Sequence, residues 1–199
     1  MRIEDIDKNF KTENSVNEEN LAYISVKNAP FDLYGFAVKE RFLRISQDVA
    51  DSVNPGVASL GPHTAGGRVR FRTDSPYVAI SVKLPYVTKF PHMPLTGTTG
   101  FDAYRTDGRE QIYVGTFVPP NESERGYTAK IGGGFIGEGD YIINMPLYND
   151  VSKVYIGIKK GAKLSQSISK YINEPPIVYY GSSITQGGCA SRPGNCYQS

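Results

Sequence analysis

The 199-residue sequence contains no tryptophan, two cysteines and two histidines. It also has no apolar run of about 18 residues, so a membrane-spanning helix is not expected. Lys and Arg together number 22 against 20 for Asp and Glu, which leaves a formal net charge of +2. The basic residues are spread along the chain instead of forming the stripe typical of nucleic-acid-binding proteins. The composition therefore argues against nucleic acid as a partner.

The two cysteines, Cys189 and Cys196, have no histidine nearby, and their spacing is poor for a metal site. We expect neither a metal nor a cofactor. Two alternatives stay open for the pair. They are free thiols, or they form a local disulfide that would contribute about 2–3 kcal/mol and indicate an oxidising compartment.

The first 20 residues are polar and acidic and lack an apolar segment, so they do not form a signal peptide as written. The protein is therefore cytoplasmic, or a leader has been removed and it is secreted or periplasmic. Residues 1–20 are expected to be a flexible N-terminal segment because they offer little to bury.

Aromatic residues make up 12% of the chain, and it contains 21 Gly and 13 Pro. This composition is typical of short strands joined by turns. Apolar runs of four to eight residues between turn residues predict strands at 42–45, 100–105, 111–118, 127–131, 141–144 and 153–158. No convincing helical stripe precedes residue 160. We therefore predict a mainly β fold over residues 21–170, an antiparallel β-sandwich or jelly roll.

Two neighbouring segments show the clearest alternation. Residues 68–73 alternate polar and apolar side chains, and residues 78–84 do the same. Asp74-Ser75-Pro76 between them is a turn signal. The pattern predicts a β-hairpin.

The pattern changes after the linker that ends at Pro175 and Pro176. Residues 177–180 are continuously apolar and are closed by Gly181, which indicates a strand buried on both faces of a parallel sheet. Such a strand needs parallel neighbours with long crossover connections, and only 23 residues remain. Residues 171–199 are therefore interpreted as a linker and the start of an incomplete α/β domain.

The segment Gly181-Ser182-Ser183-Ile184-Thr185-Gln186-Gly187-Gly188 places hydroxyl residues directly after this strand. Ligands bind at such strand ends in open α/β folds. From spacing alone, however, a plain turn with capping hydroxyls is the simpler interpretation. The segment matches neither the GxSxG elbow nor a phosphate-binding loop.

Residues 177–187 resemble the first conserved block of SGNH/GDSL hydrolases, whose catalytic domain is flavodoxin-like. Residues 190–194 resemble a subgroup in which a β-sandwich precedes that domain. Phe31-Asp32-Leu33-Tyr34 resembles the G-x-D-L-Y signature of this sandwich, and residues 145–149 are also similar to it. The resemblance covers roughly residues 28–199.

The resemblance implies that Ser183 is the catalytic nucleophile and that its backbone N–H donates to the oxyanion. Ser182 stands in place of the usual Asp, and Pro30 stands where the signature has Gly. The remaining oxyanion donors and an Asp-x-x-His would lie downstream, in the protein's own catalytic domain. The isolated chain is therefore expected to be inactive. The implied substrates are acylated carbohydrates, acetylated ones for example, or small esters.

Other candidates receive structural interpretations. His63 and His92 are predicted to be loop residues, with a smaller chance of lining the site or binding ligand. Asp32 is predicted to be a turn or cap acceptor and Tyr34 a buried anchor. Gly132-Gly133-Gly134 is predicted to be a flexible loop. The alternative function is a non-catalytic carbohydrate-binding module in which tyrosines stack on sugar rings.

Overall fold

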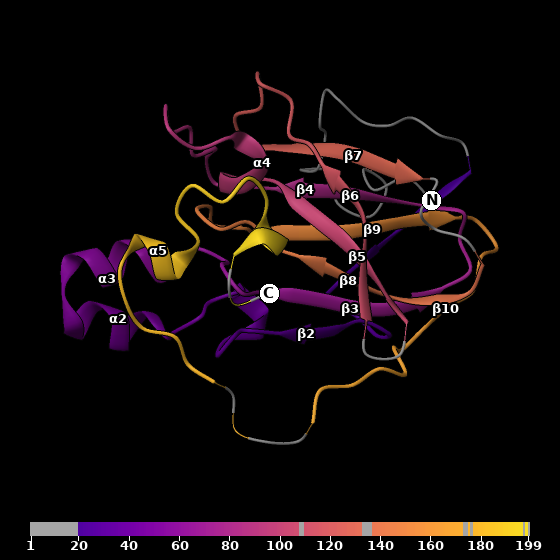
Figure 1. Ribbon diagram of the computed structural model, residues 1–199, viewed down its shortest axis with the longest axis horizontal. Coiled ribbons are helices and arrows are strands. Elements are labelled where there is room, and N and C mark those ends of the chain that lie inside the picture. The colour runs from indigo at the N-terminus through magenta and orange to yellow at the C-terminus, as the bar shows by residue number, and fades with distance from the viewer. Residues whose placement is uncertain are drawn as a thin grey trace.

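A computed structural model describes residues 20–107, 110–132, 137–172, 175, 177–196 and 198 of the chain. The predicted flexible segment lies outside these residues, except for Asn20. Within them the protein is mainly β and built from two antiparallel sheets (Figure 1). The predicted mainly β, antiparallel fold class is therefore confirmed, whereas its closer description as a jelly roll and the start of an α/β domain after it stay predictions.

The first sheet has four strands in the order β1-β9-β4-β7. They are β1 (Leu21–Ser25), β9 (Lys153–Lys159), β4 (Tyr77–Lys83) and β7 (Gly126–Gly132). The second sheet has the order β10-β3-β8-β5-β6, with β2 paired to β3. Its strands are β10 (Leu164–Ser165), β3 (Arg68–Thr73), β8 (Gly139–Asn144), β5 (Phe101–Asp107), β6 (Glu110–Phe117) and β2 (Asp32–Tyr34).

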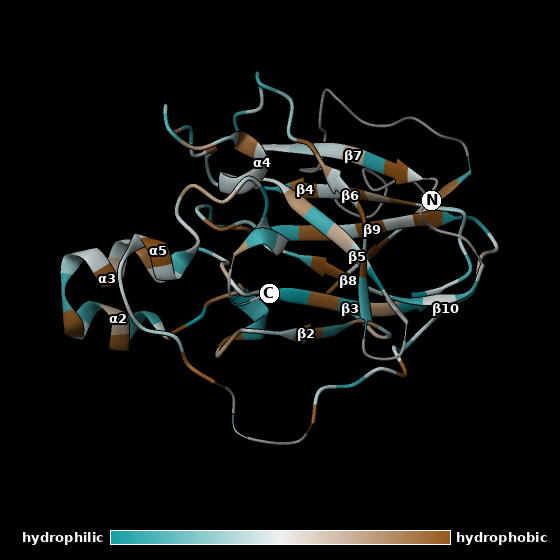
Figure 2. Cartoon of the chain, in the orientation of Figure 1, coloured by the Kyte–Doolittle hydropathy of each residue, from teal (hydrophilic) through white to brown (hydrophobic). Residues whose placement is uncertain are grey.

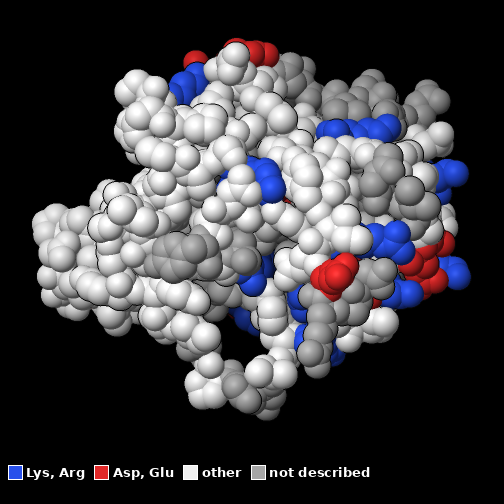
Figure 3. Space-filling model, viewed as in Figure 1, with Lys and Arg blue, Asp and Glu red and all other residues white. Residues whose placement is uncertain are grey.

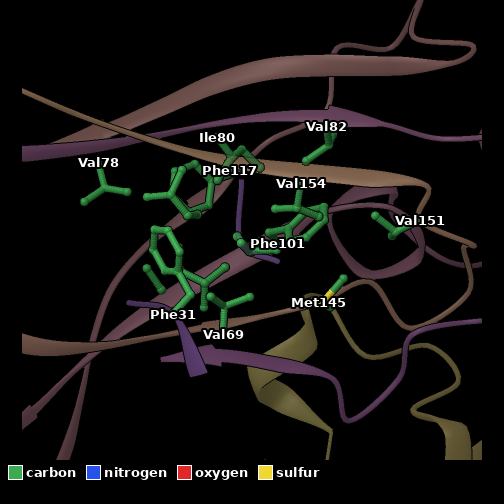
Figure 4. Close-up of a cluster of buried hydrophobic side chains, with 14 of the residues drawn as sticks. Phe31, Val69, Val78, Ile80, Val82, Phe101, Phe117, Met145, Val151 and Val154 are labelled. Carbon is green, nitrogen blue, oxygen red and sulfur yellow. The ribbon is translucent and has the colours of Figure 1, made fainter. Parts of the chain in front are cut away.

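The core lies between the two sheets, with side chains from both (Figure 4). Val78, Ile80 and Val82 of β4 are fully buried, as are Val69 of β3 and Phe101 of β5. Burying a side chain of this size stabilises the fold by about 1.5–3 kcal/mol. The alternating patterns of the sequence therefore identify strands with one face toward this shared core.

The predicted hairpin of residues 68–73 and 78–84 is wrong. Both strands form, but β3 pairs with β2, β8 and β10, whereas β4 pairs with β7 and β9. The connection instead passes from one sheet to the other. Ser75 fixes the crossing, because its Oγ donates to Tyr77 O at 2.6 Å and accepts from Lys159 N at 3.1 Å. Alternation shows only which face of a strand points into the core. Strands of the same sheet and strands of opposite sheets both show it, so it does not identify which strands pair.

Short helices interrupt the strands where none was expected. They are η1 (Lys39–Arg41), α2 (Gln47–Val53), α3 (Pro55–Leu60), α4 (Leu95–Thr98), α5 (Ser183–Gln186) and η2 (Pro193–Asn195). Asn54 and Pro55 begin α3. Asn54 caps it by accepting from Val57 N at 2.9 Å, and Pro55 takes the first helical position, which suits its fixed φ. Each helix is too short for a periodic stripe to be visible in the sequence.

The predicted strand at 42–45 is also wrong. Phe42 has a φ of 54°, and Leu43 makes only an isolated bridge with Val38. Phe42 is fully buried in the core and packs edge-on against Phe36. Its apolar character therefore reflects burial in a loop.

Residues 177–180 do not form the predicted buried strand. They lie in the connection between β10 and α5, where Figure 2 shows isolated apolar segments. Ile177, Val178 and Tyr180 are each about four-fifths exposed, at 79%, 83% and 83%. The physical reason is that the described chain provides no parallel strand for them to pair with. None of the helices described here has the length and apolar character to cross a membrane.

Candidate functional site

Ser183 begins α5, at the end of the molecule where α2 and α3 lie (Figure 1). Ser182 is the N-cap, and its Oγ accepts from Ile184 N at 3.3 Å. Gly187 ends the helix with a φ of 96°, a conformation that glycine adopts without strain. The Ser183 side chain is exposed. Residues 182–196 are called the serine segment below.

The sandwich holds the backbone of α5 from beneath. Tyr148 donates its hydroxyl proton to Ser183 O at 2.9 Å. Gln186 is buried, and its Nε2 donates to Leu147 O at 2.9 Å. Both partners lie just after β8. The segment 145–149, singled out by the sequence, therefore contacts the turn that carries Ser183.

His63 lies in a loop, as predicted, but it is buried under α5. The Nδ1 atom of His63 lies 2.9 Å from Nε2 of Gln186. The Gln186 amide donates to Nδ1, so the hydrogen of the neutral His63 ring is on its own Nε2. Nε2 faces Tyr86 OH at 3.4 Å and the Asp150 carboxylate at 3.8 Å. Burial, with a smaller contribution from the charge of Arg44, lowers the pKa of His63 to about 4. The ring is therefore neutral at neutral pH and serves as a support for Gln186.

A second attachment involves a buried carboxylate on β5. Asp102 is fully buried; its Oδ2 accepts from Arg192 Nη1 at 3.0 Å and Gly194 N at 2.7 Å, and its Oδ1 from Asn144 Nδ2 at 3.0 Å. Burial raises the pKa of Asp102, and these three donors act against that rise. The Arg192 guanidinium also lies over the ring of Tyr113, 4.1 Å from its centroid. Through these three donors the Asp102 carboxylate fixes the far end of the serine segment.

A third contact joins α4 to the middle of the serine segment. Thr96 Oγ1 donates to Ser191 O at 2.6 Å. A Cβ on Gly97 would lie 2.1 Å from Ala190 O. Since real Cβ atoms do not approach so closely, only glycine fits at this position.

A hollow of about 310 Å³ opens beside Ser183. The sandwich lines it with Phe90, His92, Met93 and Tyr148. The serine segment lines it with Ser183, Ile184, Gly188 and Cys189. His92 lies in a loop, as predicted, and its ring stacks on Phe90 at 5.3 Å and 13°. The arrangement places Ser183 at a pocket whose lining includes no Lys, Arg, Asp or Glu.

The remaining candidates have structural contacts. Asp32 Oδ1 accepts from Gln166 Nε2 at 2.9 Å, and Tyr34 packs edge-on against Tyr171 at 4.7 Å. Tyr34 is only half-buried. Gly132 ends β7, whereas Gly133 and Gly134, the rest of the predicted flexible loop, lie outside the described residues.

Cys189 is exposed and Cys196 buried, and neither forms a disulfide, so the alternative without a disulfide holds. Within the described part of the chain, no group of three or more His, Cys, Asp or Glu side chains is placed to hold a metal ion.

The sequence did not single out Asp102, Arg192, Gln186 and Tyr86 as partners. Several of their contacts join positions far apart in the chain, such as Asp150 with Tyr86, 64 positions apart, and Arg44 with Gln186, 142 positions apart. Gln186 and Arg192 lie in blocks that resemble a known family, 177–187 and 190–194, whereas nothing in the sequence drew attention to Asp102 or Tyr86.

Fold and site together define a two-sheet domain that supports a serine-bearing turn at one end. The chain belongs to the family described as "GxDLY: N-terminus of Esterase_SGNH_hydro-type", which matches residues 21–164. It is thus the N-terminal domain of an SGNH-type, esterase- or lipase-like protein, as the resemblance implied.

Two solved structures share the fold. A protein from Bacteroides ovatus ATCC 8483, described as a GDSL-like lipase, is 25% identical with a TM-score of 0.75, and the match covers 89% of this chain and 52% of that one. The salicylyl-acyltransferase SsfX3 of a tetracycline biosynthetic pathway is 18% identical with a TM-score of 0.56, over 77% of this chain and 43% of that one. The chain therefore spans about half the length of these proteins. The search of curated proteins found no match.

Proposed function

We propose that this chain is the N-terminal part of a serine ester hydrolase of the SGNH type, with Ser183 as its nucleophile. The Ser183 oxygen attacks the ester carbonyl, the alcohol leaves, and water then releases the acid from the acyl-enzyme. The backbone N–H of Ser183 serves as one donor to the oxyanion. The other donors and the base belong to the protein's own catalytic domain.

One observation supports this proposal above the others: an exposed serine lies beside a pocket while its backbone is tied to the sandwich. Tyr148 holds Ser183 O at 2.9 Å, and Asp102 holds Arg192 at 3.0 Å. A plain solvent-facing turn needs no such support. Fixed placement of a reacting group is what catalysis by proximity requires.

The proposed substrates are esters of small molecules or acylated carbohydrates, acetylated carbohydrates among them. In this proposal the sandwich has two tasks that are compatible. It packs against the catalytic domain, and it contributes Phe90, His92 and Tyr148 to the pocket beside Ser183.

The 199-residue chain by itself is expected to be inactive. A serine hydroxyl without a base is a poor nucleophile, and loss of the base in a comparable triad lowers turnover by a factor on the order of 10⁶. Hydrolysis of p-nitrophenyl acetate tests this. Activity of the isolated chain that Ser183→Ala abolishes would contradict the expected inactivity.

The nucleophile is tested in the protein extended by its catalytic domain. Ser183→Ala is expected to abolish hydrolysis, and Ser182→Ala is the matched control because it removes the neighbouring hydroxyl. Unchanged turnover in Ser183→Ala would refute the proposal. Glycan binding together with unchanged turnover would favour a carbohydrate-binding module instead.

A further inference from the structure

We propose that the hollow beside Ser183 is a subsite for a flat, uncharged apolar group of the ester, walled by the rings of Phe90, His92 and Tyr148. This inference rests on the proposed function, since it assigns the substrate class of the same site. In this proposal the loop between β4 and α4 contributes to substrate specificity, in addition to the role of the sandwich in positioning the serine.

The three rings form a connected aromatic wall. Phe90 and His92 stack with centroids 5.3 Å apart, and Phe90 meets the Tyr148 ring edge-on at 5.6 Å. The Tyr148 hydroxyl bonds to Ser183 O, so this ring cannot turn without releasing the serine backbone. Phe90 is 37% exposed, which leaves ring surface available to a ligand. Aromatic surface of this kind favours stacked or edge-on contact with another flat ring.

The residues that line the hollow carry no formally charged Lys, Arg, Asp or Glu side chain. The surface around the hollow is similar: in Figure 3 no Lys, Arg, Asp or Glu side chain is visible on the part of this face over α2, α3 and α5. A charged group moved into such surroundings would lose its hydration without gaining a partner. The hollow therefore favours a neutral apolar group.

The volume of about 310 Å³ is at the small end of the range of roughly 300–1,000 Å³ for small-molecule pockets. An acetyl group alone would leave much of this space unfilled. A six-membered ring attached to either side of the ester bond fits the space and the wall better.

The aromatic wall is fixed before any ligand arrives. Asn149 is buried; its Nδ2 donates to Tyr86 O at 2.7 Å, and its Oδ1 accepts from Thr88 N at 2.8 Å. These bonds hold the start of the loop that carries Phe90 and His92. A preformed wall loses little conformational freedom on binding.

The test is ligand binding by the full chain, followed by NMR titration, because binding does not require hydrolysis. Three neutral acetamides serve as uncleaved probes: N-phenylacetamide, N-cyclohexylacetamide and N-acetylglucosamine. We expect the phenyl compound to bind about three to ten times more tightly than the other two, a difference that aromatic contacts supply. Shifted resonances should include those of Phe90, Tyr148 and Gly188.

Variants distinguish contact with an aromatic ring from a general preference of the hollow for apolar groups. Phe90→Leu keeps an apolar side chain but removes the ring, and it is expected to weaken binding of the phenyl probe about threefold to tenfold. Ile112→Ala is the control, since Ile112 is 51% exposed on β6 and does not line the hollow. N-methylbenzamide, whose only ring is on the acyl side, then reports whether a ring is accepted on that side of the bond.

Equal affinity for the three acetamides, tighter binding of the sugar, or no effect of Phe90→Leu would overturn the subsite. These outcomes differ from failure of the proposed function, in which Ser183→Ala leaves hydrolysis by the extended protein unchanged while the phenyl probe still binds.

Discussion

The carboxylate of Asp102 and the guanidinium of Arg192 lie 3.0 Å apart although 90 positions separate them in the chain. Asp102 is fully buried in the sandwich, and Arg192 follows the proposed nucleophile on the serine segment. The pair therefore couples the stability of the β domain to the position of the reactive turn.

Arg192→Ala is expected to lower the free energy of unfolding by about 2–3 kcal/mol, because the buried carboxylate loses its charged partner. Urea denaturation measures this loss, and amide hydrogen exchange over residues 190–196 should become faster. Lys170→Ala is the control, as Lys170 is an exposed cation. Equal stability of the Arg192→Ala variant and the parent protein would show that the ion pair has no supporting role.

Gly97→Ala tests the close approach of α4 to the serine segment. The new Cβ would lie 2.1 Å from Ala190 O, so the segment must shift, at a cost of about 1–3 kcal/mol. Faster hydrogen exchange at residues 188–191 is the expected signature. Gly132→Ala is the matched control, because its Cβ would meet its nearest neighbour at 3.7 Å and should leave that exchange unaltered. Identical exchange in both variants would contradict the prediction.

His63 predicts a specific pH dependence of stability. Its folded pKa of about 4 is below the unfolded value of about 6.5, so the unfolded chain binds a proton in this interval that the folded chain does not. The contribution of His63 to the free energy of unfolding is fully present above pH 6.5. It falls as the pH drops toward 4, by roughly 3 kcal/mol in all.

His63→Gln removes that titration, while its side-chain oxygen can still accept from Gln186. The difference in unfolding free energy between this variant and the parent should therefore change between pH 6.5 and 4. The other groups that face the ring, Arg44, Asp150 and Tyr86, remain in both proteins. A difference that is constant with pH would show that burial does not depress the pKa of His63.

Asn149→Ala should destabilise the protein by about 2–4 kcal/mol, because buried backbone groups lose their partners. Besides Thr88 and Tyr86, Asn149 accepts from Thr99 Oγ1 at 3.1 Å. Thermal unfolding gives the magnitude, and the Phe90 ring should become more mobile by NMR. Asn121→Ala, at an exposed asparagine, should change neither quantity. A wild-type melting temperature for Asn149→Ala would contradict this account.

The sequence predicts much of the β architecture because one face of each strand is buried. The runs at 127–131, 141–144 and 153–158 fall within strands β7 to β9, and those at 100–105 and 111–118 match β5 and β6 except for one residue each, at 100 and 118. Their pairing was not predictable, since an inward face does not specify a sheet, and β3 and β4 show this directly. The prediction of a strand at 177–180 was wrong for a different reason. A strand buried on both faces requires neighbouring strands that the described chain does not provide.

The candidate site was predictable only in part. Ser183 and the block at 145–149 came from resemblance to a family, and the structure brings them within hydrogen-bonding distance through Tyr148. His63 and Gln186, 123 positions apart, show no pattern in sequence. Their connection depends on tertiary packing, which composition and periodicity do not encode.

The segment between β10 and α5 joins the sandwich to the serine segment in the chain. Its apolar residues at 177–180 project into solvent, whereas the peptide beyond them is fastened at α5, at α4 and at β5. A protease that cut this connecting segment would leave the reactive turn seated on the domain as a non-covalent fragment.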